Sequence, residues 1–224
     1  MMSLDNGGNR IKIGISLFFV AVLSIQGYRL VIDERYHTQA VAFNEQGKFF
    51  SEQRRYDEAI ESYQQAIKIK VDYAEAFNNL AKALNKQDKL EESAAYYKKA
   101  ILLKSGYAEP YINLGLSLNK QGYFEEAILL YRKALAINPD LFRTHNNLAS
   151  LLAERGDIEE ALSHYRQAIS LYPGFAKAHN NIGSTMARQG KFTKAIAYFE
   201  KAINIDPSYI DARKNLELAR SLSK

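Results

Sequence analysis

Hydrophobic and small residues recur along this chain at spacings of three and four, the period of one face of an α-helix. The clearest example is the stretch 108–141, AEPYINLGLSLNKQGYFEEAILLYRKALAINPDL. It contains two such runs, which are separated by Gly122 and closed by Pro139: Tyr111, Leu114, Gly115 and Leu118, then Phe124, Ala127, Tyr131 and Ala134. Glycine favours the tight turn between two helices, and proline ends the second helix. The stretch therefore predicts a helical hairpin.

The same pattern recurs in tandem at an offset of 34 residues. Small residues allow two helices to approach closely, and an aromatic residue opposite them fills the remaining space. The small positions are Ala59, Ser93, Ala127, Ala161 and Ala195, then Ala66, Ala100, Ala134, Ala168 and Ala202, then Gly47, Ala81, Gly115, Ala149 and Gly183, and the aromatic position is Tyr63, Tyr97, Tyr131, Tyr165 and Phe199. We therefore expect hairpins that pack on one another as an all-α solenoid.

A helix–turn–helix unit with this period and these positions resembles the tetratricopeptide repeat over residues 40–209. The resemblance implies a right-handed superhelix of five hairpins: 40–73, 74–107, 108–141, 142–175 and 176–209. The first hairpin diverges most, with Gln46 in place of a Leu or Ile and Arg54 in place of a turn glycine. Residues 210–224 predict a capping helix whose inward side chains are Ala212, Leu216, Ala219 and Leu222.

The composition narrows the possible chemistry. Hydrophobic residues make up 47% of the chain and charged residues 25%, which is ordinary for an ordered domain. The net charge of +5 is spread along the chain, so we expect no nucleic-acid partner. The chain has no cysteine, which excludes disulfides and cysteine-bound zinc.

The N-terminal region predicts a membrane segment. Residues 1–12 form a polar tail, and residues 13–28 carry no charge. We expect a single-pass anchor over residues 13–31, followed by a connector at 32–39. A cleaved signal peptide and a hydrophobic helix packed on the first repeat are the alternatives.

The charges around this segment favour one orientation. Arg10 and Lys12 precede the apolar run, and Arg29 and Arg35 follow it. Positively charged groups favour the cytoplasmic side of a membrane, and the amino terminus adds one such group before the segment. We therefore expect the repeats on the non-cytoplasmic side of a membrane.

The motifs of common enzymes are absent from the sequence. It contains no Gly-rich phosphate loop, no G-x-S-x-G and no H-E-x-x-H. His145 and His179 occupy the same repeat position, which suggests either a paired metal or proton site or a helix-packing position that accepts histidine. We favour packing, and we expect no cofactor, no metal and no catalytic activity.

Asparagine gives the strongest candidate for binding. It recurs every 34 residues at Asn79, Asn113, Asn147, Asn181 and Asn215, and a second series precedes it at Asn78, Asn146 and Asn180. An amide both donates and accepts, so a row of amides can hold the backbone of an extended peptide. The row resembles the repeats of O-linked N-acetylglucosamine transferase, where such residues line the concave groove. The alternative is that these amides bond neighbouring helices to each other.

Basic residues are expected on the same face, at Lys48, Lys82, Lys86, Lys120 and Arg188. They would favour acidic segments of a partner, whereas the alternative is ordinary solvated charge. The sequence as a whole predicts a non-catalytic, membrane-anchored scaffold that binds protein segments in its groove and assists assembly of a membrane or envelope complex. The alternatives are a substrate-recognition arm for a separate glycosyltransferase, a secreted adaptor, and self-association.

Overall fold

The computed structural model describes residues 35–223, which form helices joined by short turns. The predicted tail (1–12), the predicted anchor (13–31) and the beginning of the connector (32–39) lie outside the described residues. Within the described range, no helix is both long enough and apolar enough to cross a membrane. The anchor and its orientation therefore stay predictions.

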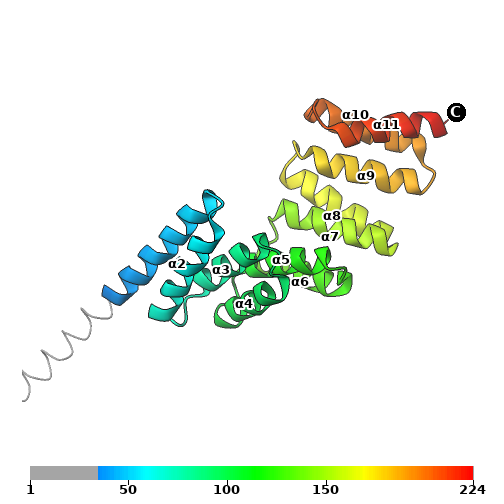
Figure 1. Ribbon diagram of the computed structural model, residues 1–224. Coiled ribbons are helices and arrows are strands. Elements are labelled where there is room, and N and C mark those ends of the chain that lie inside the picture. The colour runs from blue at the N-terminus through cyan, green and yellow to red at the C-terminus, as the bar shows by residue number, and fades with distance from the viewer. Residues whose placement is uncertain (1–34, 224) are drawn as a thin grey trace, which may run out of the picture. The chain divides into compact units, whose positions relative to one another are not determined.

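The chain divides into two compact units between Gln87 and Asp88. Each unit is a series of helices packed in chain order (Figure 1). The first unit contains helical residues 35–52, α2 (Tyr56–Ile69) and α3 (Ala74–Lys86). The second contains α4 (Leu90–Leu103), α5 (Ala108–Lys120), α6 (Phe124–Ile137), α7 (Phe142–Arg155), α8 (Ile158–Leu171), α9 (Ala176–Arg188), α10 (Phe192–Ile205) and α11 (Ile210–Leu222). The predicted all-α solenoid is confirmed.

The predicted small and aromatic positions form the core of each hairpin. All the small residues that repeat every 34 positions are buried, and so are the five aromatic residues. At Gly115 a Cβ atom would lie 2.7 Å from Cε1 of Tyr131, closer than atoms can pack. The aromatic ring thus rests directly on the backbone of the first helix, which explains why this position takes only Gly or Ala.

The turn within each hairpin requires a left-handed residue. The φ angles are positive at Gly122, Gly156 and Gly190, and also at Arg54 and Asp88. Glycine adopts this conformation without steric cost, whereas a side chain does not. The first two hairpins therefore keep the same turn geometry with less suitable residues.

Two side chains differ from the predicted inward positions. Leu222 is 55% exposed and Phe124 is 48% exposed. Phe124 is the first residue of α6, and Leu222 is the last residue of α11. Both lie at helix ends. Ala212, Leu216 and Ala219 are buried as predicted.

Candidate functional site

The predicted asparagine series lies on the first helices of the hairpins. In the second unit these helices are α5, α7, α9 and α11, of which α7 contacts α9 and α9 contacts α11. The outer asparagines are all partly buried: Asn79 on α3, Asn113 on α5, Asn147 on α7, Asn181 on α9 and Asn215 on α11. They share one face within each unit because their spacing equals the repeat length.

The inner asparagines are buried and hold neighbouring hairpins together. Asn44, Asn78, Asn146 and Asn180 are 6% exposed or less. In each unit an outer amide Nδ2 donates to the Oδ1 of an inner asparagine 35 residues earlier. The three bonds are Asn79 to Asn44 at 3.0 Å, Asn181 to Asn146 at 3.0 Å and Asn215 to Asn180 at 2.9 Å. Asn78, Asn146 and Asn180 therefore do not face solvent as the groove hypothesis requires, because a buried amide needs an internal partner.

The ladder is interrupted at one position. Ile112 occupies the place of the inner asparagine in the third hairpin. Asn147, which would bond to that residue, is partly exposed and makes no side-chain hydrogen bond within residues 35–223. By contrast, Asn181 also donates to Ser150 Oγ at 3.4 Å, so both of its N–H groups are used. Asn147 thus presents a free amide on the face of α7.

The sequence-based prediction overlooked Asn44, Ser150 and the consequence of Ile112. The inner series begins at Asn44 and, up to Asn180, skips only position 112, a signal that was present in the sequence. The bonded asparagines lie 35 residues apart, whereas equivalent repeat positions lie 34 residues apart, so a comparison at the repeat period does not pair them. The ladder instead joins two different positions of successive hairpins.

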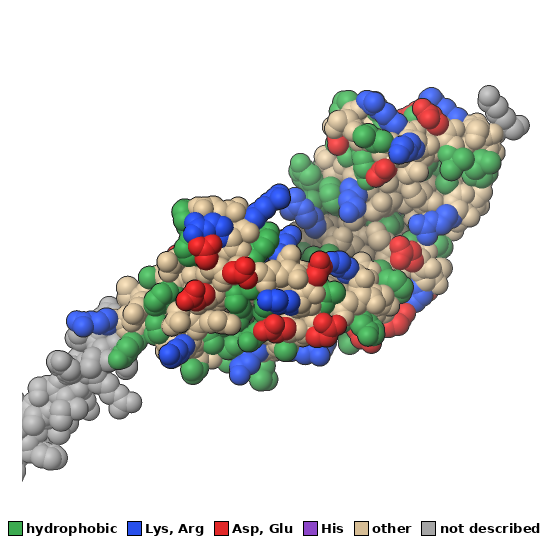
Figure 2. Space-filling model, in the orientation of Figure 1, with side chains coloured by type: hydrophobic (Ala, Val, Ile, Leu, Met, Phe, Trp, Pro, Cys, Tyr) green, Lys and Arg blue, Asp and Glu red, His purple; other side chains and the backbone are tan. Residues whose placement is uncertain are grey.

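The predicted basic residues do not form one continuous row. Lys48 pairs with Glu45 at 2.7 Å, and Lys120 pairs with Asp88. Lys82 and Lys86 are exposed on α3, and Arg188 is exposed on α9. Within the second unit Glu154 stands at the equivalent position on α7, between Lys120 and Arg188. An acidic residue therefore interrupts the predicted basic positions in this unit, and their role in binding an acidic partner stays a prediction. Figure 2 likewise shows acidic and basic side chains interspersed on the face it presents.

The histidines at the shared repeat position cap backbone carbonyls. His145 Nε2 lies 2.9 Å from the carbonyl oxygen of Pro139, and His179 bonds to the backbone of Pro173. Both side chains are buried. A carbonyl only accepts, so Nε2 of His145 carries the proton. These contacts agree with the packing interpretation, and no group of three metal-binding side chains occurs within residues 35–223.

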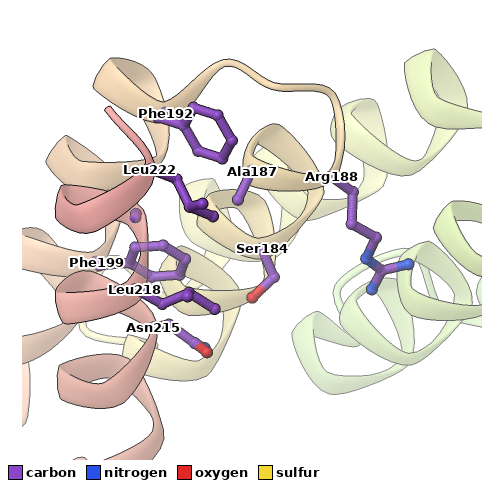
Figure 3. Close-up of a pocket in the computed structure, with 9 residues that line it drawn as sticks. Ser184, Ala187, Arg188, Phe192, Phe199, Asn215, Leu218 and Leu222 are labelled. Carbon is purple, nitrogen blue, oxygen red and sulfur yellow. The ribbon is translucent and has the colours of Figure 1, made fainter. Parts of the chain in front are cut away.

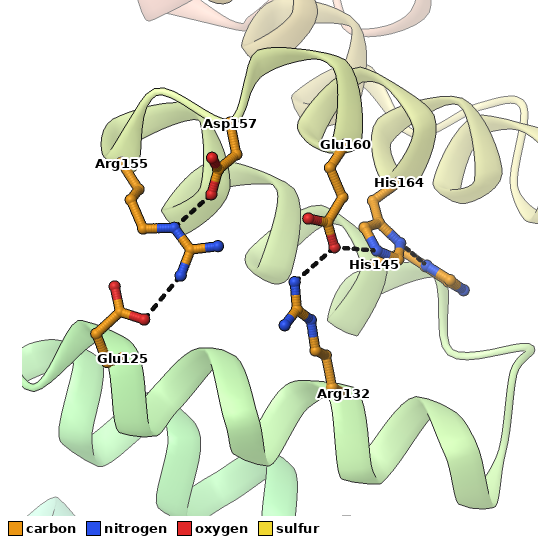
Figure 4. A network of polar contacts seen from close by, with 7 residues as sticks. All are labelled: Glu125, Arg132, His145, Arg155, Asp157, Glu160 and His164. Carbon is orange, nitrogen blue, oxygen red and sulfur yellow. Dashed lines mark hydrogen bonds and ion pairs between the residues drawn. The ribbon is translucent and has the colours of Figure 1, made fainter.

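A third histidine completes a polar cluster on α6, α7 and α8 (Figure 4). His164 Nδ1 lies 2.9 Å from His145 Nδ1, so one of these two nitrogens donates a hydrogen bond and the other accepts it. His164 Nε2 lies 3.8 Å from Glu160, and Glu160 pairs with Arg132 at 2.7 Å. Burial lowers the pKa of His164, and the neighbouring His145 lowers that pKa further. Folding therefore favours the neutral form of His164 over its charged form.

The ion pairs beside this cluster connect successive hairpins. Arg155 pairs with Glu125 at 2.7 Å and also with Asp157. Arg132 on α6 reaches Glu160 on α8. These side chains are about one third to two thirds exposed, so each pair contributes little to stability. The pairs Arg155–Glu125 and Arg132–Glu160 thus join different hairpins but add little to the stability of the fold.

Sequence models of the tetratricopeptide repeat match residues 42–88, 74–104, 108–174 and 140–208, which together make up more than half of the chain. No curated protein sequence matches the chain.

Several solved structures have the same fold. YrrB, described as a TPR protein with an unusual peptide-binding site, is 22% identical with a TM-score of 0.68 over 85% of this chain and 97% of its own. MamA is 25% identical with a TM-score of 0.66 over 72% of this chain and 94% of its own. The thermophilic TPR protein TTC0263 of Thermus thermophilus is 21% identical with a TM-score of 0.61 over 81% of this chain and 99% of its own. With its helical hairpins, buried small-residue seam and model matches, the chain belongs to the tetratricopeptide repeat family of protein-interaction scaffolds.

Proposed function

We propose that the chain holds extended peptide segments of a partner protein along the face of α5, α7, α9 and α11, without catalysing a reaction. The observation that carries the proposal is the free amide of Asn147. Asn181 and Asn215 use their N–H groups between hairpins, whereas Asn147 has both its donors and its acceptor available. An amide of this kind can bond to the N–H and C=O groups of a peptide backbone.

The accessibility of the Asn147 amide strengthens this argument. Its side chain is partly buried, but within residues 35–223 neither its nitrogen nor its oxygen is among the buried side-chain atoms that lack a hydrogen-bond partner. The amide is therefore open to solvent, and a peptide can reach it without breaking a bond between hairpins. The similarity of YrrB in fold is consistent with a peptide ligand, since YrrB is described as having a peptide-binding site.

The experiment compares single substitutions in the full chain on an array of random twelve-residue peptides. We expect Asn147→Ala to weaken peptide binding about fivefold, the effect of one or two hydrogen bonds, with little loss of stability. Asn181→Ala is the matched control at the equivalent position, and it should cost about 1 kcal/mol of folding free energy because it breaks a buried rung.

A second variant closes the gap instead of removing the amide. Ile112→Asn places an acceptor where Asn146 stands in the next hairpin, so Asn147 should bond to it and become less available. Peptide binding should fall while Asn147 itself is unchanged. If wild type and both variants bind peptides equally, Asn147 does not contact the ligand.

The membrane anchor is part of the same proposal and rests on the sequence of residues 13–31. A tethered scaffold would act at a membrane or envelope complex, with the repeats on the non-cytoplasmic side. Carbonate extraction of membranes tests the anchor, and we expect the full chain to stay in the pellet. Val20→Arg should release it, and extraction of the unaltered chain would refute the anchor. The similarity to O-linked N-acetylglucosamine transferase repeats, and the recognition-arm alternative that it suggests, stay predictions.

A further inference from the structure

A pocket of about 280 Å³ opens between α9, α10 and α11 at the last joint between hairpins (Figure 3). Its walls are mainly apolar and come from Phe192 and Phe199 of α10 and from Leu218, Ala219 and Leu222 of α11. Leu218 is 59% exposed, so apolar surface at the mouth of the pocket is in contact with solvent. Exposed apolar side chains gathered around a pocket mark a binding site more often than isolated ones do.

The preceding joint has polar side chains where this pocket has apolar ones. There, the hydroxyl of Tyr165 donates to Ser150 Oγ at 3.1 Å and also bonds to Thr185. The equivalent residues at the last joint, 34 positions later, are Phe199, Ser184 and Ala219. Phenylalanine and alanine lack the hydroxyl groups of tyrosine and threonine, so the wall of this pocket is apolar where the preceding joint has hydrogen bonds. Ser184 Oγ consequently has no hydrogen-bond partner in the described part of the chain.

The rim of the pocket supplies polar groups and positive charge. Asn215 donates its amide to Asn180, which leaves its Oδ1 able to accept. Arg188 is exposed at the edge, makes no ion pair within residues 35–223, and directs its guanidinium group away from the apolar walls (Figure 3). Residues 176–223 hold eight Lys and Arg against four Asp and Glu. Arg188, the one charged residue that lines the pocket, therefore favours a ligand that carries negative charge.

We propose that this pocket binds one bulky apolar side chain of an extended peptide, with an acidic residue beside it that pairs with Arg188. This inference rests on the proposed peptide-binding function and specifies its sequence preference. The volume of about 280 Å³ is large enough to admit a Phe, Leu or Met side chain. Ser184 and Asn215 lie where a peptide backbone would pass, one able to donate and the other to accept.

The test introduces the hydroxyl-bearing side chains of the preceding joint at the equivalent positions of the last joint. The double variant Phe199→Tyr/Ala219→Thr restores both hydroxyl groups opposite Ser184, so it should fold at least as stably as wild type. On an array of acetylated twelve-residue peptides, the full wild-type chain should select a large apolar residue with Asp or Glu within two positions. The double variant should lose this selection, with binding of such peptides reduced about tenfold.

A charge variant tests the second half of the motif. Arg188→Glu should keep the preference for the apolar residue and reverse the preference beside it from acidic to basic. Lys191→Glu is the matched control, because Lys191 lies close in sequence but does not line the pocket. Equal effects of the two variants would overturn the specific role of Arg188.

The outcomes separate this inference from the proposed function. Peptides that bind wild type and the double variant alike, with Asn147→Ala still impaired, would overturn the pocket while the peptide function stands. No binding by wild type would overturn both. A concentration-dependent molecular mass that the double variant abolishes would show that a second copy of the chain occupies the pocket, and would also overturn the proposal.

Discussion

Two joints in the second unit are built from equivalent helices in the same order but differ in the side chains that meet there. At the joint of α7, α8 and α9, Tyr165 bonds to Ser150, and Asn181 closes a rung with Asn146. At the joint of α9, α10 and α11 the rung is kept through Asn215, but Phe199 leaves an apolar pocket. The comparison teaches that the repeat specifies the backbone, while departures from it create the surfaces available to a ligand.

The largest expected effect comes from overfilling the last joint. A Cβ on Gly183 would lie 2.6 Å from Cε1 of Phe199. Gly183→Val should therefore displace the ring and destabilise the second unit by about 3 kcal/mol, as measured by urea unfolding. Helix α7 has Ala149 at this position, so the two joints differ in how closely the ring approaches the backbone.

A matched control is available in the turn before α9. A Cβ on Gly174 would lie 3.6 Å from Tyr172, which is ordinary contact. Gly174→Ala should change the unfolding free energy by less than about 0.5 kcal/mol. A similar loss in both variants would mean that helix and turn preferences, rather than the aromatic ring, determine the effect at Gly183.

A smaller effect is expected from converting the filled joint into the open one. Tyr165→Phe removes the bonds to Ser150 and Thr185, which should cost about 1 kcal/mol. Phe199 makes the same aromatic packing without a hydroxyl, so the fold should be retained. Tyr172→Phe is the control, because the Tyr172 side chain is half exposed and makes no hydrogen bond within the described range. A double-mutant cycle with Ser150→Ala should show coupling for Tyr165 only.

The smallest effect is a dependence of stability on pH that both regions share. Burial lowers the pKa values of His164 and His179 below the ordinary 6.5. Around His164, Glu160 opposes this shift and Arg132 adds to it; around His179, the Pro173 backbone opposes it and Lys201 adds to it. The unfolded chain therefore takes up protons first as the pH falls.

The direction of the change follows from these pKa shifts. The stabilisation is complete above the unfolded pKa of about 6.5 and is lost as the pH falls towards the lower folded values. Urea midpoints at pH 7.5 and 5.5 should differ in this direction, by less than the effect of Tyr165→Phe. His164→Gln should reduce the difference, and an unchanged difference would assign the pH dependence to other groups.

The core of each hairpin was predictable because it depends on local spacing. Ala127, Tyr131 and Ala134 repeat at helical intervals, and all three are buried as the pattern indicates. The binding face was harder to predict. The spacing placed the outer asparagines on one side, but the choice between a ligand and a neighbouring helix depends on a second residue 35 positions away.

The sequence by itself determined the family, the helical hairpins and the seam, because a 34-residue period of small and aromatic residues leaves few other ways to bury apolar surface. Only the tertiary structure decided that Asn181 bonds to Asn146 while Asn147 stays free, and that Phe199 borders a pocket. These outcomes depend on which side chains meet across a joint. When one hairpin lacks the inner asparagine, the outer asparagine of the next hairpin is left without its bond. The sequence of a single repeat does not show this, because the two residues belong to different repeats.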